Sequence, residues 1–322
     1  MSHYLARTAF CAAILGALAA CTADDPTRPA VVPGVSANAT GPRTLVVDND
    51  GADCPNVDFA TIQAAVAAAD PGATILVCAG TYLEQVTIAK NDLRVLAKGK
   101  PGDVTLDGLD LPAMIAGFRL ENAHGNLIEG FVVRNYHEAG IWLRTGSSGN
   151  TIRMNVTTGS PFHDGIQLQN APGNLVEHNR AVANFSPASV ACGINVIGGG
   201  SDGNVVRHNE VFENDFGIQV AAGADNNLIF HNESHDNRRF GIRNLAAANG
   251  NVIENNRSVN NAGPGIAVFL SSTGVTVARN KAFNNAPDLF WDLVGANTFE
   301  NNHCRTSVPP GLCEHTEGES PK

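Results

Sequence analysis

Eight versions of one short phrase recur along this chain at nearly constant spacing. In outline the phrase is Gly-Asn, two apolar residues, a charged or polar residue, and Asn. The copies start at Asn126, Asn150, Asn174, Asn204, Asn227, Asn251, Val275 and Asn297, with spacings of 24, 24, 30, 23, 24, 24 and 22 residues. A period of this length is typical of a chain that stacks one supersecondary unit on the next.

Each period contains three short β-type runs. They are the phrase itself, a second run after the next Asn, and a third that begins with Gly-Ile at positions 140, 165, 193, 217, 241 and 265. A propeller blade needs longer strands, and a leucine-rich repeat needs a helical segment. The sequence therefore predicts an all-β, right-handed, single-stranded parallel β-helix, whose coils stack at about 4.8 Å.

The N-terminal part of this domain has a different period. Apolar residues recur at helical spacing over 59–69, after Asp58 and before Pro71-Gly72. Asp58 is a suitable N-cap and Pro-Gly a suitable stop, so we expect a capping helix here. The expected domain spans 44–315, with an N-terminal cap at 44–72, coils at 73–303 and a C-terminal loop at 304–315.

Two columns of asparagine follow from stacking the periods. One contains Asn179, Asn209, Asn232, Asn256, Asn280 and Asn302, and the other contains Asn184, Asn214, Asn237, Asn261 and Asn285. A side-chain amide both donates and accepts, so identical amides can bond along a stack. We therefore predict a structural role for these residues. The series Glu129, Arg153, Glu177, Arg207 alternates in charge, which predicts ion pairs between adjacent coils.

Residues 1–21 have the pattern of an export signal. Arg7 precedes an apolar run over 9–20, and Leu18-Ala19-Ala20-Cys21 resembles the bacterial lipobox, in which Cys21 is lipidated. The alternative is an ordinary cleaved signal peptide. Residues 22–43 then form a flexible tether, and 316–322 a disordered tail. We expect a protein of the bacterial cell envelope that touches the membrane through a lipid anchor only.

Net charge limits the classes of ligand that the protein can bind, and the cysteine content indicates its disulfides. With 21 basic and 31 acidic residues, the formal net charge is −10, which argues against nucleic-acid binding. Acidic polysaccharides would be repelled too, unless local basic residues or a bound cation compensate. An exported chain permits disulfides, and we expect Cys54–Cys78 and Cys304–Cys313, leaving Cys192 free.

Residues 59–299 resemble the right-handed parallel β-helix superfamily that includes pectate lyases. The similarity rests on Phe59-Ala60-Thr61-Ile62-Gln63-Ala64-Ala65, Pro71-Gly72-Ala73-Thr74-Ile75 and Gly80-Thr81-Tyr82-Leu83-Glu84, together with the repeats. The pattern is most similar to a short-repeat group of carbohydrate-binding proteins and sugar hydrolases, which also contains the copper accessory proteins of nitrous oxide reductase. This resemblance implies the fold but not one function, because the fold hosts lyases, hydrolases, epimerases and non-catalytic binders.

The residues around each Gly-Ile form the most irregular polar columns. If each Ile points inward, the residues that alternate with it point outward. The predicted substrate-binding residues on this strip are Trp142, Arg144, Gln167, Asn195, Gln219 and Arg243. The 30-residue interval inserts Phe185-Ser186-Pro187-Ala188-Ser189 just before Gly193, and such insertions commonly border a binding face. The alternative is ordinary variation of exposed turns.

Proton abstraction beside a uronate carboxylate needs a base and a group that neutralises the carboxylate. The candidates are His163, Asp164, Glu138 and Asp215 as base or cation ligands, and Arg239 with Arg243 as neutralising groups. Ser160-Pro161-Phe162-His163-Asp164 resembles the Asp-Pro-His-Asp motif of alginate C5-epimerases, with departures at Ser160 and at the inserted Phe162. A lyase of this kind would use Ca²⁺.

Three histidines, His178, His208 and His231, each precede a column asparagine. Imidazoles on consecutive coils could chelate Cu or Zn. The alternative is a polar column beside the turn, continued by Asn255, Arg279 and Asn301.

The leading hypothesis is a monomeric lipoprotein that binds an acidic polysaccharide, with lyase or C5-epimerase activity as its catalytic version. The rival hypothesis is a non-catalytic surface binding protein or scaffold, or a periplasmic copper-handling accessory protein.

Overall fold

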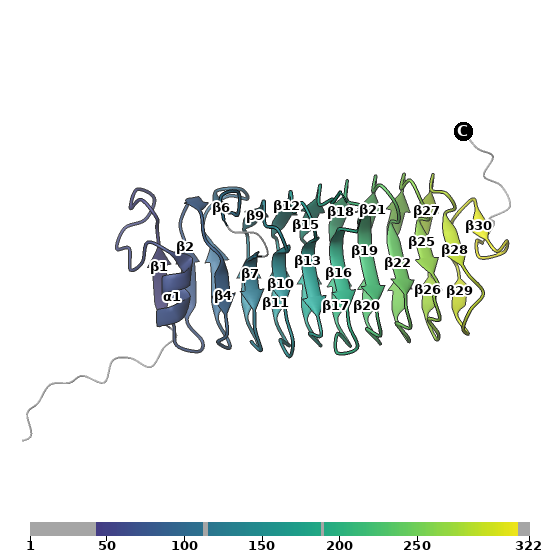
Figure 1. Ribbon diagram of the computed structural model, residues 1–322, viewed down its shortest axis with the longest axis horizontal. Coiled ribbons are helices and arrows are strands. Elements are labelled where there is room, and N and C mark those ends of the chain that lie inside the picture. Colours follow the sequence, from purple (N-terminus) through teal and green to yellow (C-terminus); the bar gives the residue numbers. More distant parts are fainter. Residues whose placement is uncertain (1–42, 112–114, 188–189, 315–322) are drawn as a thin grey trace, which may run out of the picture. The chain divides into compact units, whose positions relative to one another are not determined.

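The computed structural model describes residues 43–111, 115–187 and 190–314. The predicted signal with Cys21, nearly all of the tether and the tail at 316–322 lie outside these ranges. The described residues form a parallel β-solenoid of stacked coils, shown in Figure 1, which confirms the predicted fold class. Within these ranges, none of the helical structure has the length and apolar character that a membrane span requires.

Three parallel sheets run the length of the stack. Sheet A contains β1 (Thr44–Val47), β2 (Thr74–Val77), β5 (Arg94–Ala97), β8 (Leu127–Glu129), β11 (Thr151–Arg153), β14 (Leu175–Glu177), β17 (Val205–Arg207), β20 (Leu228–Phe230), β23 (Val252–Glu254), β26 (Thr276–Ala278) and β29 (Thr298–Glu300). Sheet B contains β3 (Gly80–Tyr82), β6 (Val104–Asp107), β9 (Val132–Arg134), β12 (Val156–Thr158), β15 (Arg180–Val182), β18 (Glu210–Phe212), β21 (Glu233–His235), β24 (Arg257–Val259) and β27 (Lys281–Phe283). Sheet C contains β4 (Val86–Ile88), β7 (Ala116–Leu120), β10 (Ala139–Leu143), β13 (Asp164–Gln169), β16 (Cys192–Ile197), β19 (Phe216–Ala221), β22 (Ile242–Leu245), β25 (Ile266–Val268), β28 (Leu289–Trp291) and β30 (Ser307–Val308).

The Gly-Ile dipeptides lie at the start of the sheet C strands, and their isoleucines form one fully buried column in the core. Ile141 pairs in register with Ile166, and the column continues through Ile194, Ile218, Ile242 and Ile266. The glycine is required by close approach. A Cβ on Gly217 would overlap the Ser234 hydroxyl and the Gly241 carbonyl of the next coil.

One helix, α1 (Ile62–Ala68), covers the N-terminal end of the core with Ile62, Ala65 and Val66. It is shorter than predicted, and Thr61 rather than Asp58 is its N-cap, because the Thr61 side chain accepts from the Ala64 amide. Asp58 instead accepts a hydrogen bond from the Val46 amide of β1. The Glu84 carboxylate accepts from the first two helical amides, those of Ile62 and Gln63.

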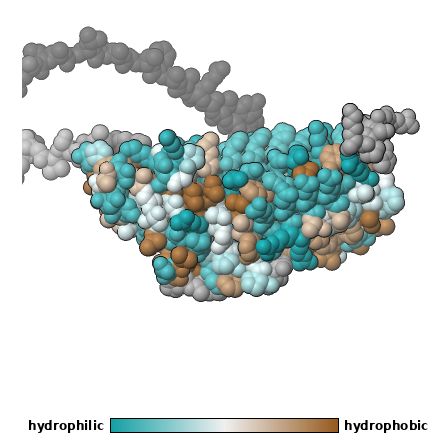
Figure 2. Space-filling model, turned by 90° about the horizontal axis from the view of Figure 1, so that it is seen from above, coloured by the Kyte–Doolittle hydropathy of each residue, from teal (hydrophilic) through white to brown (hydrophobic). Residues whose placement is uncertain are grey.

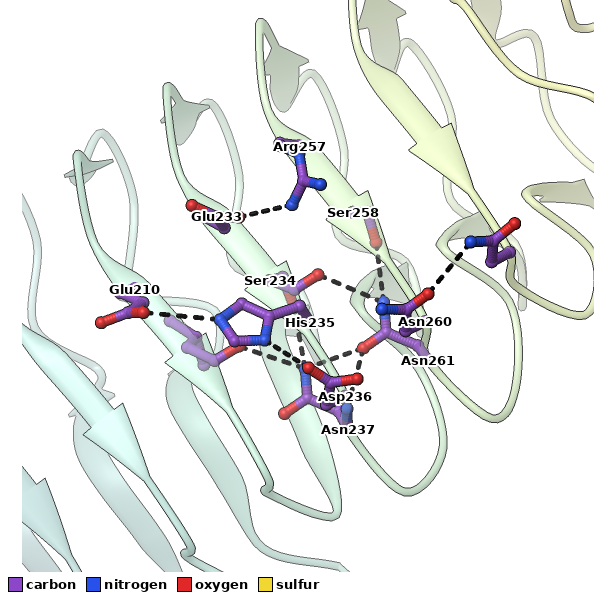
Figure 3. A network of polar contacts seen from close by, with 12 residues as sticks. Glu210, Glu233, Ser234, His235, Asp236, Asn237, Arg257, Ser258, Asn260 and Asn261 are labelled. Atoms are coloured by element: carbon purple, nitrogen blue, oxygen red, sulfur yellow. Dashed lines mark hydrogen bonds and ion pairs between the residues drawn. The ribbon is translucent and has the colours of Figure 1, made fainter. Parts of the chain in front are cut away.

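Asparagine ladders run along the corners between the sheets. Both predicted columns are present, as the Asn179 amide donating to Asn209 at 3.1 Å and the Asn184 amide donating to Asn214 at 3.0 Å illustrate. Figure 3 shows the second ladder at Asn237 and Asn261, with the Glu233–Arg257 pair beside it. A third ladder, not predicted, links the phrase asparagines themselves from Asn126 through Asn150, Asn174, Asn204, Asn227 and Asn251.

The expected charge pairs and cysteine pairs are also found in the structure. Arg153 contacts Glu129 at 2.8 Å, and Arg207 contacts Glu177 at 2.7 Å, each pair joining adjacent coils of sheet A. Cys54 is bonded to Cys78 in the N-terminal cap, and Cys304 to Cys313 in the last loop. Cys192 is free and buried.

Candidate functional site

The predicted polar strip forms one in-register column on the outer face of sheet C. Trp142 pairs with Gln167, and the column continues through Asn195, Gln219 and Arg243 on β16, β19 and β22. Its members alternate with the core isoleucines and leucines, so they point away from the core. However, Gln167, Asn195 and Gln219 are each less than a tenth exposed. The strip is therefore a packed surface, not an open row of side chains.

A chain of hydrogen bonds joins the central residues of this strip. The Gln219 amide donates to the Asn195 oxygen at 2.9 Å, and the Asn195 amide donates to Asp164 at 2.8 Å. The other Asp164 oxygen accepts from the Cys192 backbone amide at 2.7 Å. Burial raises the pKa of the Asp164 carboxyl, and these hydrogen bonds offset part of the rise. Asp164 is thus held rigidly, with both oxygens engaged.

The indole ring of Trp142 is already stacked. The Arg144 guanidinium lies 4.4 Å from the ring centroid and that of Arg119 5.9 Å, while Arg144 also pairs with Glu121 at 3.0 Å. Such cation–π stacking covers part of the indole surface that we expected to receive a sugar ring. Trp142 is therefore part of a partly exposed cluster with Arg119, Arg144 and Glu121 at one end of the strip.

Arg243 is engaged at the other end of the strip. Its guanidinium carbon lies 3.3 Å from the Phe216 ring centroid and 5.6 Å from that of Phe240. Burial lowers the pKa of the Arg243 guanidinium. Its Nε is buried and has no hydrogen-bond partner. Arg239 also stacks on Phe216, at 4.8 Å. The two cations expected to neutralise a substrate carboxylate thus share one aromatic ring.

Asp215 has a structural task that the sequence did not indicate. One of its oxygens accepts from the backbone amides of Ser186 at 2.8 Å and Ala191 at 3.3 Å. Ser186 belongs to the insertion between β15 and β16, and Ala191 follows it, so this buried carboxylate holds the chain on both sides of the inserted residues. Its other oxygen has no hydrogen bond and lies 3.9 Å from the Arg238 guanidinium.

The turns between sheets B and C, here called the B–C turns, line two cavities that are open to solvent. The first, of about 420 Å³, is lined by Gly159, Ser160, Pro161, Phe162, Ala183, Phe185, Ser186, Pro187 and Arg238. The second, of about 340 Å³, is lined by Gly108, Leu109, Leu111, Asn135, His137, Gly159 and Pro161. They share Gly159 and Pro161, so they are neighbours along the stack. Figure 2 views the molecule from above and shows a mostly hydrophilic surface with apolar side chains gathered in a few places.

The aromatic walls of the first cavity are its distinctive feature. Phe162 and Phe185 are about 40% exposed. The His137 ring stacks on the Phe162 ring with 3.9 Å between centroids, and the Arg238 guanidinium carbon lies 3.8 Å from the Phe185 ring centroid. The Ser160 hydroxyl is buried in the lining without a hydrogen-bond partner. The sequence indicated this place through the inserted Phe162 and the long interval, but not the roles of Phe185 and Arg238.

Three candidates for proton transfer lie at the B–C turns or the adjoining strand start. His163 is exposed and directly precedes the buried Asp164, with which it interacts electrostatically. Glu138 is 9% exposed, and its backbone amide donates to the Ile115 carbonyl at 3.1 Å. His163 thus has the freest access to solvent of the three.

The three column histidines lie on consecutive coils, as expected. The rings of His178 and His208 are 5.0 Å apart and nearly parallel, and those of His208 and His231 are 5.1 Å apart. Desolvation and the neighbouring imidazoles lower the pKa of His208. Over the described ranges, no three histidine ligand atoms come within 4.8 Å of one another.

Two other groups have ligand atoms that close together, and both include Asp48. One adds Asp50 and Asp53, and the other adds the disulfide-bonded Cys54 and Cys78. The Asp48 oxygens already accept from four backbone amides, those of Asp50, Gly51, Asp53 and Cys54. Neither group includes a residue that we predicted to bind Ca²⁺.

Comparison with known proteins identifies a family and several solved structures with a similar fold. A family model described as the right handed beta helix region matches residues 61–211, 95–249 and 163–304. No curated protein matches the chain.

Solved structures with a similar fold include the pectate lyase Pel9A, with a TM-score of 0.66, 18% identity and coverage of 87% of this chain and 83% of that one. The A-module of the mannuronan C-5 epimerase AlgE4 from Azotobacter vinelandii has a TM-score of 0.59 at 19% identity, covering 76% and 81%. The tailspike of E. coli bacteriophage HK620, solved with a pentasaccharide, has a TM-score of 0.57 at 13% identity, covering 76% and 52%. At these identities the likeness shows the fold alone.

Proposed function

The chain belongs to the right-handed β-helix family, and we propose that it binds an acidic polysaccharide along the B–C turns. The observation that carries this proposal is the cavity of about 420 Å³ walled by Phe162 and Phe185 with Arg238 at its side. Solved structures of the same fold include a pectate lyase, an alginate epimerase and a tailspike with a bound pentasaccharide, which supports a glycan as the ligand.

The chemistry of the cavity suits a sugar acid. Aromatic rings offer apolar faces to the C–H groups of a pyranose, and a guanidinium offers a bidentate donor to its carboxylate. Arg238 is about half exposed, so it can reach a ligand while it stacks on Phe185. This local cation offsets the repulsion that the overall charge of −10 would impose on an acidic chain.

The catalytic version of the proposal assigns proton abstraction to His163. Its side chain is exposed at the turn that lines the cavity, whereas Asp164 is buried with both oxygens hydrogen-bonded. Asp164 then acts as a positioning residue for the start of β13. A lyase would release an unsaturated product, and a C5-epimerase would invert one carbon without cleavage. In the lyase version, Ca²⁺ would be supplied from solution to neutralise the substrate carboxylate.

Binding can be tested by titration calorimetry with polygalacturonate and alginate, using neutral dextran as the control glycan. We expect Arg238→Gln and Phe185→Ala each to weaken binding of a polyuronate by about tenfold or more. Loss of one important interface side chain costs more than about 1 kcal/mol, and about 1.4 kcal/mol corresponds to tenfold. Arg180→Gln is the matched control, because Arg180 also stacks on an aromatic ring, Phe212 at 4.6 Å, but on sheet B. Equal binding by Arg238→Gln and the parent protein would rule out this cavity as the site.

Catalysis is tested separately with the same glycans, with and without Ca²⁺. Ultraviolet absorbance reports a lyase product, and proton NMR reports epimerisation. Loss of either signal in His163→Ala, with glycan binding retained, is the expected result. Binding without turnover in the parent protein would leave a glycan-binding module and would exclude the catalytic version.

We propose further that Cys21 anchors the protein to a membrane of the bacterial envelope, as the lipobox-like segment predicts. In cells that express the full chain, Cys21→Ala should move the protein from the membrane fraction to the soluble fraction. An unchanged membrane fraction would exclude the anchor.

A further inference from the structure

The corner between sheets A and B carries one thioether and three imidazole side chains on consecutive coils. Met154, His178, His208 and His231 each follow a sheet A strand and share the same left-handed backbone conformation, with φ between 53° and 56°. Met154 occupies the same place in the repeat one coil before the three histidines. Met154 is 55% exposed, so its side chain can be reached from solution.

The backbone beneath these side chains is fixed. The next residue in each coil is a ladder asparagine, so Asn155, Asn179, Asn209 and Asn232 are linked by hydrogen bonds of 3.0–3.2 Å. The ladder holds the four corner residues in register at the spacing of adjacent coils. The ring separations of 5.0 and 5.1 Å show that register directly.

The three rings are exposed, and they have no competing polar partner. Among the described residues, His178, His208 and His231 form no ion pair or side-chain hydrogen bond, in contrast to His235, which pairs with Glu210 and Asp236. Nearby charges are matched with each other, as Glu177 with Arg207 and Arg180 with Glu210. The imidazole nitrogens are therefore available to a ligand from solution.

We propose that Met154, His178, His208 and His231 form a copper-binding column. Imidazole nitrogens bind Cu²⁺, and a thioether adds affinity for Cu⁺, so this set of donors selects copper over the hard cations Ca²⁺ and Mg²⁺. Among divalent ions, imidazole sites also bind Cu²⁺ more tightly than Zn²⁺. This site lies on a different corner from the B–C turns and does not depend on glycan binding.

Binding requires a small rearrangement of side chains. The rings of His178 and His208 are nearly parallel and that of His231 is tilted by 38°, and among the described residues no three of their donor atoms lie within 4.8 Å of one another. The proposal requires rotation about χ1 and χ2 that turns two neighbouring rings toward one ion, and exposed side chains can change between staggered rotamers at low cost. His208 is the central member, so it takes part in either neighbouring pair.

The test is a titration of the full chain with Cu²⁺, Zn²⁺ and Ca²⁺ separately, followed by calorimetry and electron paramagnetic resonance. The parent and all variants carry His3→Ala, so that this histidine of the predicted signal segment cannot contribute to the binding. We expect His208→Ala to weaken Cu²⁺ binding by at least about 100-fold, since loss of even an outer partner of a metal ligand costs 10–100-fold. His178→Ala and His231→Ala each leave one pair intact and should have a smaller effect.

The matched control is His235→Ala, a histidine that also stacks on a ring, Phe212 at 4.8 Å, but on sheet B. It should bind Cu²⁺ like the parent. A second arm measures Cu⁺ under anaerobic conditions, where Met154→Leu should lose affinity for Cu⁺ while keeping Cu²⁺. The proposal is overturned if His208→Ala binds Cu²⁺ like His235→Ala, or if Zn²⁺ binds more tightly than Cu²⁺.

Discussion

The A–B corner and the B–C turns are built from the same repeat, yet the corner is regular whereas the turns vary in length and line the cavities. At the A–B corner a single left-handed residue and a buried ladder asparagine recur without insertion, from Met154 to Asn301. At the B–C turns the ladder begins only at Asn184, and the preceding coils carry Ser160 and Tyr136 at that place. The cavities lie at these preceding coils and at the insertion.

The difference shows how a solenoid separates stability from recognition. A ladder satisfies every amide along a corner, and it therefore leaves only the outermost side chains free to vary, as with the histidine column. At the end of the ladder, just after Asn184, the turn can lengthen, provided that other groups satisfy its backbone. Asp215 performs that task for the insertion.

The largest effect is expected at the regular corner. Asn209→Ala removes two donated bonds, to Val176 and Asn232, and the acceptor for Asn179, all within the core of the stack. Buried groups left unpaired cost about 1–3 kcal/mol each, so we expect a loss on the order of 3 kcal/mol or more. Urea unfolding followed by circular dichroism measures it. A loss below about 1 kcal/mol would mean that the ladder is not what stabilises this corner.

A smaller and more local effect is expected for Asp215→Ala at the B–C turns. The amides of Ser186 and Ala191 lose their shared acceptor, at a cost of about 1–3 kcal/mol. Hydrogen exchange should accelerate at these two amides while the Asn209 ladder stays protected. Asp215→Asn keeps one acceptor oxygen and serves as the control. Faster exchange spread evenly over the stack would contradict a local clamp.

The pH dependence of stability should reveal Asp164. Because burial raises its folded pKa above the reference value of 3.8, Asp164 favours folding most when it is protonated. The wild-type stability relative to Asp164→Asn is thus highest below about pH 3.8 and falls as pH rises through the folded pKa. Urea unfolding of both proteins at a series of pH values measures the difference. A difference that grows with pH would show that the hydrogen bonds to Asp164 outweigh its burial.

The smallest effect on stability is expected for Ser160→Ala. The Ser160 hydroxyl is buried without a partner, so its removal should change the free energy of unfolding by less than about 0.5 kcal/mol or stabilise the fold slightly. If a glycan hydroxyl binds to the Ser160 hydroxyl in the cavity, Ser160→Ala also lowers the affinity for a polyuronate, while the free energy of unfolding stays nearly unchanged. A stability loss as large as that of Asn209→Ala would remove the contrast between the two regions.

Much of the architecture was predictable because the repeat constrains each coil by its neighbours. The 24-residue period placed the asparagine columns and the Glu129–Arg153 pair correctly, since in-register stacking brings residues one period apart into contact. The start of α1 was not predictable in the same way. Asp58 and Thr61 are both good caps, and only the approach of β1, whose Val46 amide binds Asp58, decides between them.

The candidate site was predictable as a place but not as a set of roles. Alternation along the strands put Trp142, Gln167 and Arg243 on one outward column, as observed. Their partners come from other coils and rings, such as Arg144 over Trp142 and Phe216 beneath Arg243, so burial and stacking could not follow from alternation.

The sequence by itself determined that this chain forms stacked coils, which residues share a column and where the repeat is interrupted. These properties depend on spacing alone, because a parallel stack brings together residues one period apart. Only the tertiary structure decided which polar groups are free. Asp215 holds the insertion and Arg238 borders a cavity, because hydrogen bonds and cavities depend on side chains that meet from several coils at once.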